Sequence, residues 1–285
     1  LLFLFVTFNP ICISESNEEK TYFRLKKIND TWCFINPDKK PFFSIGIGSI
    51  SARSGYSPSL GFSRYNENII DKYGSEEKWA NITHDRLVKW GFNTVSSSGS
   101  YIKNTGFNYT INLNLAGDNW ETGEIADYFS DEWVNFVDER CKQRITNVSN
   151  DTKLIGYFLD NEVKFSPDWR TLLDIFDCYM KFSSNSSGKI RLVNFLENRY
   201  KDIDSFNKAW RTNLDSFSEI LHKNRLGIWP YTKKARIDHN DFLYIVSEQF
   251  FRICHNTIRK YDKNHLILGT RFQSFLTPKK TIEAC

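Results

Sequence analysis

The sequence lacks the signals that mark membrane-spanning, zinc-binding and dinucleotide-binding proteins. Outside the N-terminus, no stretch stays apolar over the roughly 20 residues that a membrane helix needs. There is no CxxC pair and no close cluster of cysteine and histidine, so a zinc site is not indicated. Gly46-Ile47-Gly48 lacks the third glycine and the downstream acidic residue of a dinucleotide fold. We therefore expect no metal, no cofactor and no membrane span in the mature protein.

The excess of basic over acidic residues is small for a chain of this length. The 38 Lys and Arg and the 34 Asp and Glu give a net charge of +4, and the basic residues are scattered. Binding to nucleic acid would need a concentrated basic patch, so no such partner is expected. The histidines are far apart in the sequence and none has an evident partner, which disfavours a metal site or a Ser-His-Asp triad. They are His84, His222, His239, His255 and His265, the last interpreted as the residue that enters a strand.

What is present is ordinary for one large globular domain. The 285 residues are 40% hydrophobic and 25% charged. Aromatic residues are abundant, at 16% of the chain. Aromatic faces stack on sugar rings as well as on core neighbours, so the excess is compatible with carbohydrate binding, although most of these rings are expected in the core.

The N-terminus is interpreted as part of a secretory signal peptide. Leu1 to Phe8 is almost continuously apolar, and cleavage is expected after Ser14 or Ser16. A short buried strand is the alternative, disfavoured by the abruptly polar residues that follow. The missing initiator Met and basic region indicate that the numbering starts inside a longer leader.

Glycosylation sequons and cysteines fit the same route. Six Asn-x-Ser/Thr triplets begin at Asn29, Asn81, Asn108, Asn147, Asn150 and Asn185. Such triplets also arise by chance, and Asn108 lies beside a predicted strand. Past the leader the cysteines are Cys33, Cys141, Cys178, Cys254 and Cys285, so one or two disulfides could form. We expect a secreted or extracellular protein, or one of the secretory-lysosomal lumen.

Short apolar runs alternate with longer helical patterns, which predicts βα units, a parallel sheet and an α/β fold. Strands are predicted at Phe42 to Ile50, Asn93 to Ser96, Tyr109 to Leu115, Leu154 to Leu159 and Leu266 to Thr270. Helices are predicted near Glu76 to Trp90, Asp131 to Asn147, Trp169 to Phe182 and Asp238 to Tyr261, with further helix over 189–222 and Asp204 as an N-cap. Residues 17–40 are expected to form an N-terminal extension with a hairpin around Asn29-Asp30.

One segment carries the chemistry. The apolar strand that starts at Leu154 ends in Asp160, Asn161 and Glu162, which places three polar residues at its carboxyl end, the catalytic face of a parallel barrel. Hydrolysis of a glycoside needs a carboxylic acid to protonate the departing oxygen, and Glu162 suits this role if Tyr157 or Phe165 raises its pKa. On the triplet alone, loop caps and a solvated first-turn residue are the favoured interpretation.

The segments around the triplet favour a catalytic role over the structural one. Ile155-Gly-Tyr-Phe-Leu-Asp-Asn-Glu162 resembles the fourth-strand signature of clan A glycoside hydrolases, especially the β-agarases and the glycoside hydrolase 42 type of β-galactosidase. The segments that match in the same order are Phe42 to Gly48, Tyr65 to Gly74, Arg86 to Thr94, Phe195 to Tyr200, Phe206 to Trp210 and Asp262 to Arg271. The resemblance covers about residues 41–278 and is far more specific than the triplet.

The resemblance implies a (β/α)8 TIM barrel over 41–285, with strands one to five present in this chain. It implies a retaining enzyme that cleaves β-linked, possibly galactose-containing, oligo- or polysaccharides. Glu162 would be its acid/base and Asn161 would orient substrate, while Asp160, Ser98 and Arg271 are candidate substrate-binding residues by position at the catalytic face.

The match fails at the nucleophile. The family places this Glu after the seventh strand, whereas the present sequence stops after the fifth, so we expect a fragment or a truncated reading frame. Glu197, Glu219 and Glu248 lie in helical patterns and are interpreted as structural. A catalytically inactive barrel that binds carbohydrate or a protein partner is the alternative function, and oligomeric state stays open.

Overall fold

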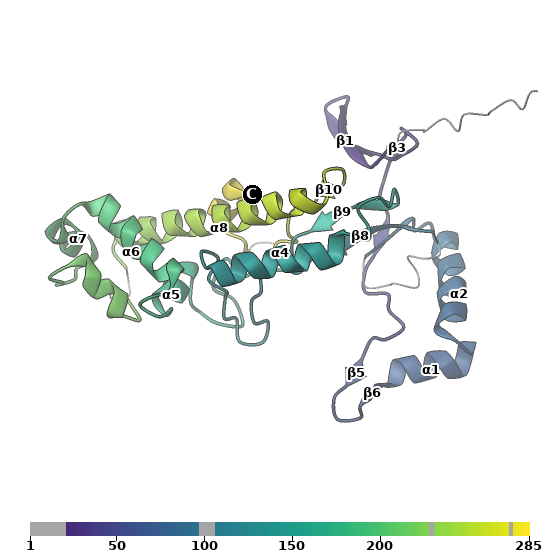
Figure 1. Ribbon diagram of the computed structural model, residues 1–285, viewed down its shortest axis with the longest axis horizontal. Coiled ribbons are helices and arrows are strands. Elements are labelled where there is room, and N and C mark those ends of the chain that lie inside the picture. Colours follow the sequence, from purple (N-terminus) through teal and green to yellow (C-terminus); the bar gives the residue numbers. More distant parts are fainter. Residues whose placement is uncertain (1–20, 97–105, 228–230, 274–275) are drawn as a thin grey trace, which may run out of the picture.

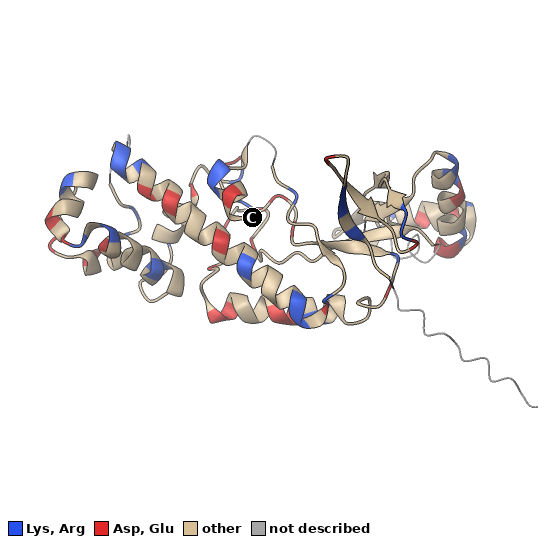
Figure 2. Ribbon diagram, turned by 90° about the horizontal axis from the view of Figure 1, so that it is seen from above, with Lys and Arg blue, Asp and Glu red and all other residues tan. Residues whose placement is uncertain are grey.

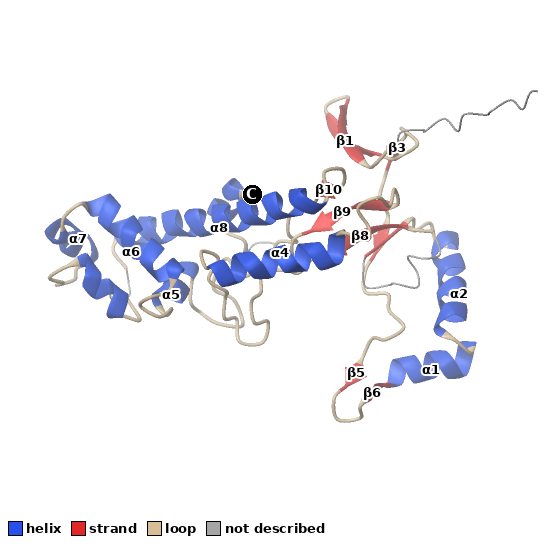
Figure 3. Ribbon diagram, in the orientation of Figure 1, coloured by secondary structure: helices blue, strands red, loops and turns tan. Residues whose placement is uncertain are grey.

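The computed structural model describes residues 21–96, 106–227, 231–273 and 276–285. A five-stranded parallel sheet forms the centre of its α/β fold (Figure 3), in the order β10-β9-β8-β7-β4. Its strands are β4 (Gly46–Ile47), β7 (Thr94–Ser96), β8 (Asn108–Asn112), β9 (Leu154–Phe158) and β10 (Leu266–Ile267). Each lies within or beside a predicted strand, so the five predicted strands are confirmed with shorter bounds.

The spatial order of these strands equals their order along the chain. A doubly wound nucleotide-binding sheet reverses its strand order, whereas a (β/α)8 barrel adds each parallel strand beside the previous one. The sheet therefore has the topology of five consecutive strands of such a barrel.

Helices make most of the connections between the described strands. Figure 1 shows α4 and the long α8 side by side, extending from the strands toward α5 to α7 at the far end of α8, with α1 and α2 on the opposite side of the strands. The α-helices are α1 (Arg64–Tyr73), α2 (Glu76–Lys89), α4 (Asp131–Ile145), α5 (Ile175–Met180), α6 (Ser187–Tyr200), α7 (Ile203–Trp210), α8 (Lys233–Tyr261) and α9 (Lys279–Ala284), with a 3-10 helix η1 (Phe217–His222).

Two helix predictions were wrong in detail. The helix expected from Trp169 begins only at Ile175, because the Asp174 side chain accepts the Asp177 N–H as an N-cap. The N-cap of α7 is Asp202, which accepts the Ser205 N–H, and Asp204 lies in the first turn. The first helix was therefore predicted to begin too early, and the cap of the second was assigned two residues too late.

The N-terminal hairpin is confirmed. Strands β1 (Arg24–Ile28), β2 (Thr31–Ile35) and β3 (Pro41–Phe42) form an antiparallel sheet. Asn29 and Asp30 both have positive φ, as a two-residue hairpin turn requires. The Tyr22 ring contacts the His265 ring at 4.8 Å between centroids, so this segment touches the start of β10. A second small hairpin joins β5 (Tyr56–Ser57) and β6 (Phe62–Ser63).

The core lies between the sheet, α4 and α8. Phe242, Val246 and Phe250 of α8 are buried at helical spacing and belong to one cluster. The Phe250 ring packs near Trp133 of α4, and the Phe242 ring packs near rings of α5 and α6. Figure 2 shows acidic and basic residues interspersed along the helices, including α8. No helix within the described residues combines the length and apolarity needed to cross a bilayer.

The one or two disulfides that the sequence allowed are not present among the described residues. Cys33, Cys141, Cys178, Cys254 and Cys285 are all free. Cys141 on α4, Cys178 on α5 and Cys254 on α8 are buried in the core cluster, and Lys164 Nζ donates to Cys178 Sγ at 3.5 Å.

Candidate functional site

The Asp160-Asn161-Glu162 triplet continues the pairing of β9 with β10. Beyond the last regular strand residue, Leu159 N–H donates to the Gly269 carbonyl at 2.8 Å, and Arg271 N–H donates to the Asp160 carbonyl at 3.2 Å. Glu162 N–H then donates to the Arg271 carbonyl at 2.9 Å. The backbone therefore places Asn161, Glu162 and Arg271 together at the carboxyl edge of the sheet, as the sequence predicted for this edge.

Arg271 contacts both functional candidates of the triplet. Its Nη1 donates to Asn161 Oδ1 at 2.9 Å and lies 2.5 Å from Glu162 Oε1. The Glu162 side chain is 25% exposed and the Arg271 side chain is 63% exposed. The carboxylate is therefore partly buried, while the guanidinium that pairs with it is open to solvent. Tyr157 and Phe165 do not have the expected role: the Tyr157 hydroxyl donates to Asp262, and Phe165 packs against rings of α8.

The Glu162 backbone is held in an unusual conformation. Its φ is +56°, in the left-handed region that glycine favours and that costs other residues about 1–2 kcal/mol. Its carbonyl accepts hydrogen bonds from Gln273 Nε2 at 3.0 Å and Arg170 Nη2 at 3.3 Å. Strained, over-determined backbone of this kind concentrates at functional sites.

The Asp160 side chain links two backbone segments at this edge of the sheet. Its carboxylate accepts the Ala116 N–H at 2.8 Å and the Asn161 N–H at 2.7 Å, which ties the end of β9 to the segment after β8. Burial raises the pKa of Asp160, and these two hydrogen bonds oppose the rise. Both carboxylate oxygens thus have backbone partners.

Two hollows meet at the triplet. One of about 970 Å³ lies over the carboxyl ends of the strands and is lined by Gly48, Ser49, Ser96, Thr110, Asn112, Asn114, Arg144, Phe158, Asp160, Asn161 and Arg271. A smaller one of about 350 Å³ is lined by Asn114, Ala116, Gly117, Asp118, Trp120, Phe136, Arg140, Asp160, Asn161, Glu162, Val163 and Arg170. Amide, hydroxyl and guanidinium groups predominate in the first, which suits a ligand rich in hydroxyls. Ser98, expected at this edge, lies outside the described residues.

Asp118 is a carboxyl group that the sequence analysis missed. It lines the smaller hollow beside Glu162 and accepts hydrogen bonds from Ala126 N–H and the Tyr128 hydroxyl. Burial raises the pKa of Asp118 to about 6 despite these bonds. Its place soon after the third predicted strand was the available signal, because the carboxyl ends of all the strands share one edge.

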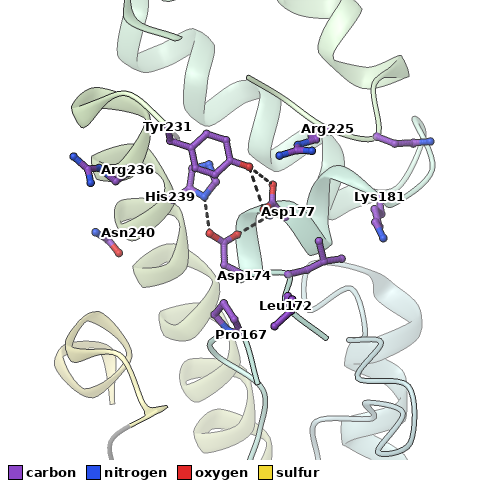
Figure 4. Close-up of a pocket in the computed structure, with 12 residues that line it drawn as sticks. Pro167, Leu172, Asp174, Asp177, Lys181, Arg225, Tyr231, Arg236, His239 and Asn240 are labelled. Carbon is purple, nitrogen blue, oxygen red and sulfur yellow. Dashed lines mark hydrogen bonds and ion pairs between the residues drawn. The ribbon is translucent and has the colours of Figure 1, made fainter. Parts of the chain in front are cut away.

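A further hollow of about 690 Å³ lies between α5 and α8, away from the sheet edge (Figure 4). His239 Nδ1 lies 2.7 Å from Asp174 Oδ2, and the Tyr231 hydroxyl donates to Asp177. Burial alone would raise the pKa of Asp174, but the hydrogen bond and charge of His239, together with the Asp177 N–H, lower it overall. Burial and the neighbouring Asp174 raise the pKa of Asp177. Among the described residues, Asp174, Asp177 and His239 form a group that could hold a metal ion.

The expectation that the histidines lack partners was wrong: His84 and His255 each contact the next residue in the sequence, and His239 and His265 have carboxylate partners in the interior. His239 meets Asp174 across 65 residues of sequence, which no local pattern indicates. His265 enters β10 as predicted, fully buried, with Nδ1 2.6 Å from Asp262 Oδ2 and Nε2 3.0 Å from the Asp151 carbonyl. Both pairs join elements of the fold, and neither lies at the Glu162 edge.

The known proteins that this chain resembles include glycoside hydrolases. A family model for glycoside hydrolase 42, described as beta-galactosidase, matches residues 130–281. Beta-agarase B of Vibrio sp. (strain JT0107) is 28% identical over 246 residues, which cover 76% of this chain and 25% of the agarase. Beta-agarase A of the same strain is 25% identical over 236 residues, covering 73% of this chain and 23% of that protein.

Solved structures share the fold. An exo-beta-agarase superposes with a TM-score of 0.78 at 22% identity, covering 93% of this chain and 48% of that chain. An agarase designated AgWH50C gives 0.77 at 20% identity and the same two coverages. These neighbours are TIM-barrel glycoside hydrolases, and the five parallel strands fit part of such a barrel. The chain spans about a quarter of the length of the curated agarases it matches.

Proposed function

The chain belongs to the glycoside hydrolase family described as beta-galactosidase, and from this membership we propose that it cleaves β-linked, galactose-containing glycans with Glu162 as the acid/base. The observation that carries the proposal is the placement of Glu162 beside Asn161 and Arg271 at the carboxyl edge of the parallel sheet. Active sites of barrel enzymes gather at this edge. No cofactor is needed for such a reaction.

The proposed reaction is a double displacement. Glu162 donates its proton to the glycosidic oxygen while a second carboxylate, about 5 Å away, attacks the anomeric carbon and the carbon–oxygen bond breaks. The Glu162 carboxylate then takes a proton from water, which attacks the glycosyl intermediate and releases the sugar with retained configuration. The Asn161 amide would donate a hydrogen bond to the sugar hydroxyl next to the anomeric carbon. Arg271 would hold the side chains of Asn161 and Glu162 in their relative positions.

The second carboxylate is not assigned to a residue of this chain. Asp118 and Asp160 line the same hollow, but their oxygens are bonded to Tyr128 and to backbone N–H groups. Glu197 and Glu248 lie on α6 and α8, and Glu219 caps η1, as expected of structural residues. The proposal therefore assigns one half of the catalytic pair.

A secretory route accompanies this proposal. Residues 1–16 would be the leader, 17–40 the extension and 41–285 the barrel domain. Five of the sequon asparagines are exposed, and Asn108 is half-buried in β8. The exposed asparagines could accept a glycan without disturbing the core.

The test is hydrolysis of aryl β-galactosides and agarose oligosaccharides, with the anomer of the first product followed by NMR. We expect cleavage with retention, and loss of turnover of oligosaccharides in Glu162→Gln. Glu197→Gln is the matched control, because Glu197 is exposed on α6. Cleavage with inversion would overturn the mechanism. Absence of cleavage with retained oligosaccharide binding would favour the inactive, carbohydrate-binding barrel.

A further inference from the structure

Two exposed tryptophans stand beside the proposed acid. Trp120 is 47% exposed and Trp169 is 69% exposed, and their ring centroids lie 5.6 Å apart in an edge-to-face arrangement. Trp120 lines the hollow of about 350 Å³ that also holds Asn161 and Glu162. Large apolar side chains left exposed at the mouth of a cavity mark a binding surface.

The guanidinium of Arg170 contacts both tryptophan rings and the backbone carbonyl of Glu162. The guanidinium of Arg170 lies 4.7 Å from the Trp120 ring centroid and 5.6 Å from the Trp169 centroid. Its side chain is 2% exposed, and it donates twice to Asp168 Oδ2, through Nε at 2.9 Å and Nη2 at 2.5 Å. Nη2 also donates to the Glu162 carbonyl at 3.3 Å. The buried ion pair between Arg170 and Asp168 therefore holds the two tryptophan rings in a fixed position relative to Glu162.

The loop that carries Trp120 is also held tightly. Asn119 Oδ1 accepts the N–H groups of Glu121 and Thr122, which closes a turn around the tryptophan. Gly123 has a φ of +69°, and a Cβ there would lie 2.7 Å from the Arg170 Cβ. Glycine thus lets this loop pack directly on the segment that carries Trp169. Binding to a preorganised surface costs less conformational entropy than binding to a mobile one.

We propose that Trp120 and Trp169 form an aromatic subsite that stacks on a pyranose ring of the saccharide, next to the bond that Glu162 protonates. This inference rests on the proposed function. A pyranose presents C–H groups on its faces and hydroxyls around its edge, so it needs an aromatic face flanked by polar groups. Asn114, Asn161 and Arg140 supply polar groups in the hollow, and the Nε donor of Arg140 has no hydrogen-bond partner among the described residues.

The test is calorimetric titration with an agarose-derived hexasaccharide, with the tryptophan variants made in the Glu162→Gln protein so that the ligand is not hydrolysed during the titration. Trp169→Ala is expected to weaken binding about threefold to tenfold, and Trp169→Phe to restore most of the affinity, because the ring face is kept. Trp120→Ala should weaken it similarly. Trp90→Ala is the control, since Trp90 is 64% exposed at the C-terminal end of α2.

Unchanged affinity in Trp169→Ala and Trp120→Ala would overturn the subsite. Equal loss in the alanine and phenylalanine variants of Trp169 would also contradict stacking. Failure of the subsite can be distinguished from failure of the proposed function. If the proposed function is wrong, Glu162→Gln keeps its turnover; if only the subsite is wrong, the tryptophan variants keep their affinity.

Discussion

Glu162 combines a charged side chain with a backbone conformation that glycine would adopt more easily. The hydrogen bonds from Gln273 and Arg170 to its carbonyl, and its own N–H to Arg271, hold that conformation. Neither the positive φ nor the contact with Arg271 is visible in the sequence. The triplet itself was predicted because polar residues abruptly end an apolar strand.

Replacing Glu162 tests whether the backbone is strained. Both Glu162→Gly and Glu162→Ala remove the carboxylate, but only glycine relaxes a φ of +56°. We expect the glycine variant to have the higher free energy of unfolding, by about 1 kcal/mol. Urea denaturation of the two variants measures this difference. An alanine variant as stable as the glycine variant would show that the position is not strained.

At the scale of elements, the approach of β10 to β9 depends on one glycine. A Cβ at Gly156 would lie 2.2 Å from the Leu266 carbonyl oxygen, whereas a Cβ at Gly46 in β4 would make only ordinary contacts, the nearest at 3.6 Å. Because β10 leads into Arg271, this contact also sets the distance between Arg271 and Glu162. Packing at the strand supports the geometry of the site.

Gly156→Ala is therefore expected to lower the free energy of unfolding by about 1–3 kcal/mol or more, since the clash is with backbone. Gly46→Ala should change it much less. Thermal or urea denaturation of both variants decides the point. Equal stability of the two variants would mean that β9 and β10 do not approach as closely as described.

The junction of α8 with β10 carries a buried network. Asp262 accepts hydrogen bonds from the Tyr157 hydroxyl at 2.7 Å and from the backbone N–H of His265 at 3.1 Å, and its Oδ2 meets His265 Nδ1. Burial alone would raise the pKa of Asp262, but these partners outweigh it and lower the pKa to about 2. Asp262 and His265 are both buried.

A lowered pKa makes this network a source of pH-dependent stability. The contribution is complete above the unfolded pKa near 4 and is lost as pH falls toward about 2, where the folded carboxylate takes its proton. Asp262→Asn should lower the unfolding free energy by about 2 kcal/mol at pH 7 and flatten its decline between pH 4 and 2. Denaturation curves over this range check it, with Asp71→Asn on the surface as control. A decline unchanged by Asp262→Asn would contradict the assignment.

Much of the element order could be predicted because apolar periodicity records it, and the barrel topology came from the resemblance. The parallel strands, α2, α4, α8 and the Asn29-Asp30 hairpin were all predicted. The late start of α5 could not be, because Asp174 caps that helix and pairs with His239 from α8. Long-range partners of this kind leave no local signal. Trp120 was missed for the same reason, because its importance lies in what it faces. Asp118 did have a signal, its place soon after the third predicted strand, and the sequence analysis did not use it.

At the scale of the whole molecule, the proposed secretory route predicts a glycosylation pattern. Expressed in a eukaryotic secretory host, the protein should lose mass on treatment with peptide N-glycosidase. Asn108 should carry no glycan, because it lies in β8 and its side-chain amide donates to the Asn93 carbonyl. Peptide mass spectrometry locates the glycans. A fully occupied Asn108, or the absence of glycan at every exposed sequon, would contradict this part of the account.

The central claim is that this barrel protonates a glycosidic oxygen through Glu162. The most direct measurement compares kcat/KM of the wild-type protein and Glu162→Gln on aryl β-galactosides with poor and good leaving groups. The account predicts a loss of about 10²–10⁴-fold for poor leaving groups and little loss for good ones, which depart without a proton. An equal loss for both classes, or no loss for either, would contradict the role of Glu162 as the acid.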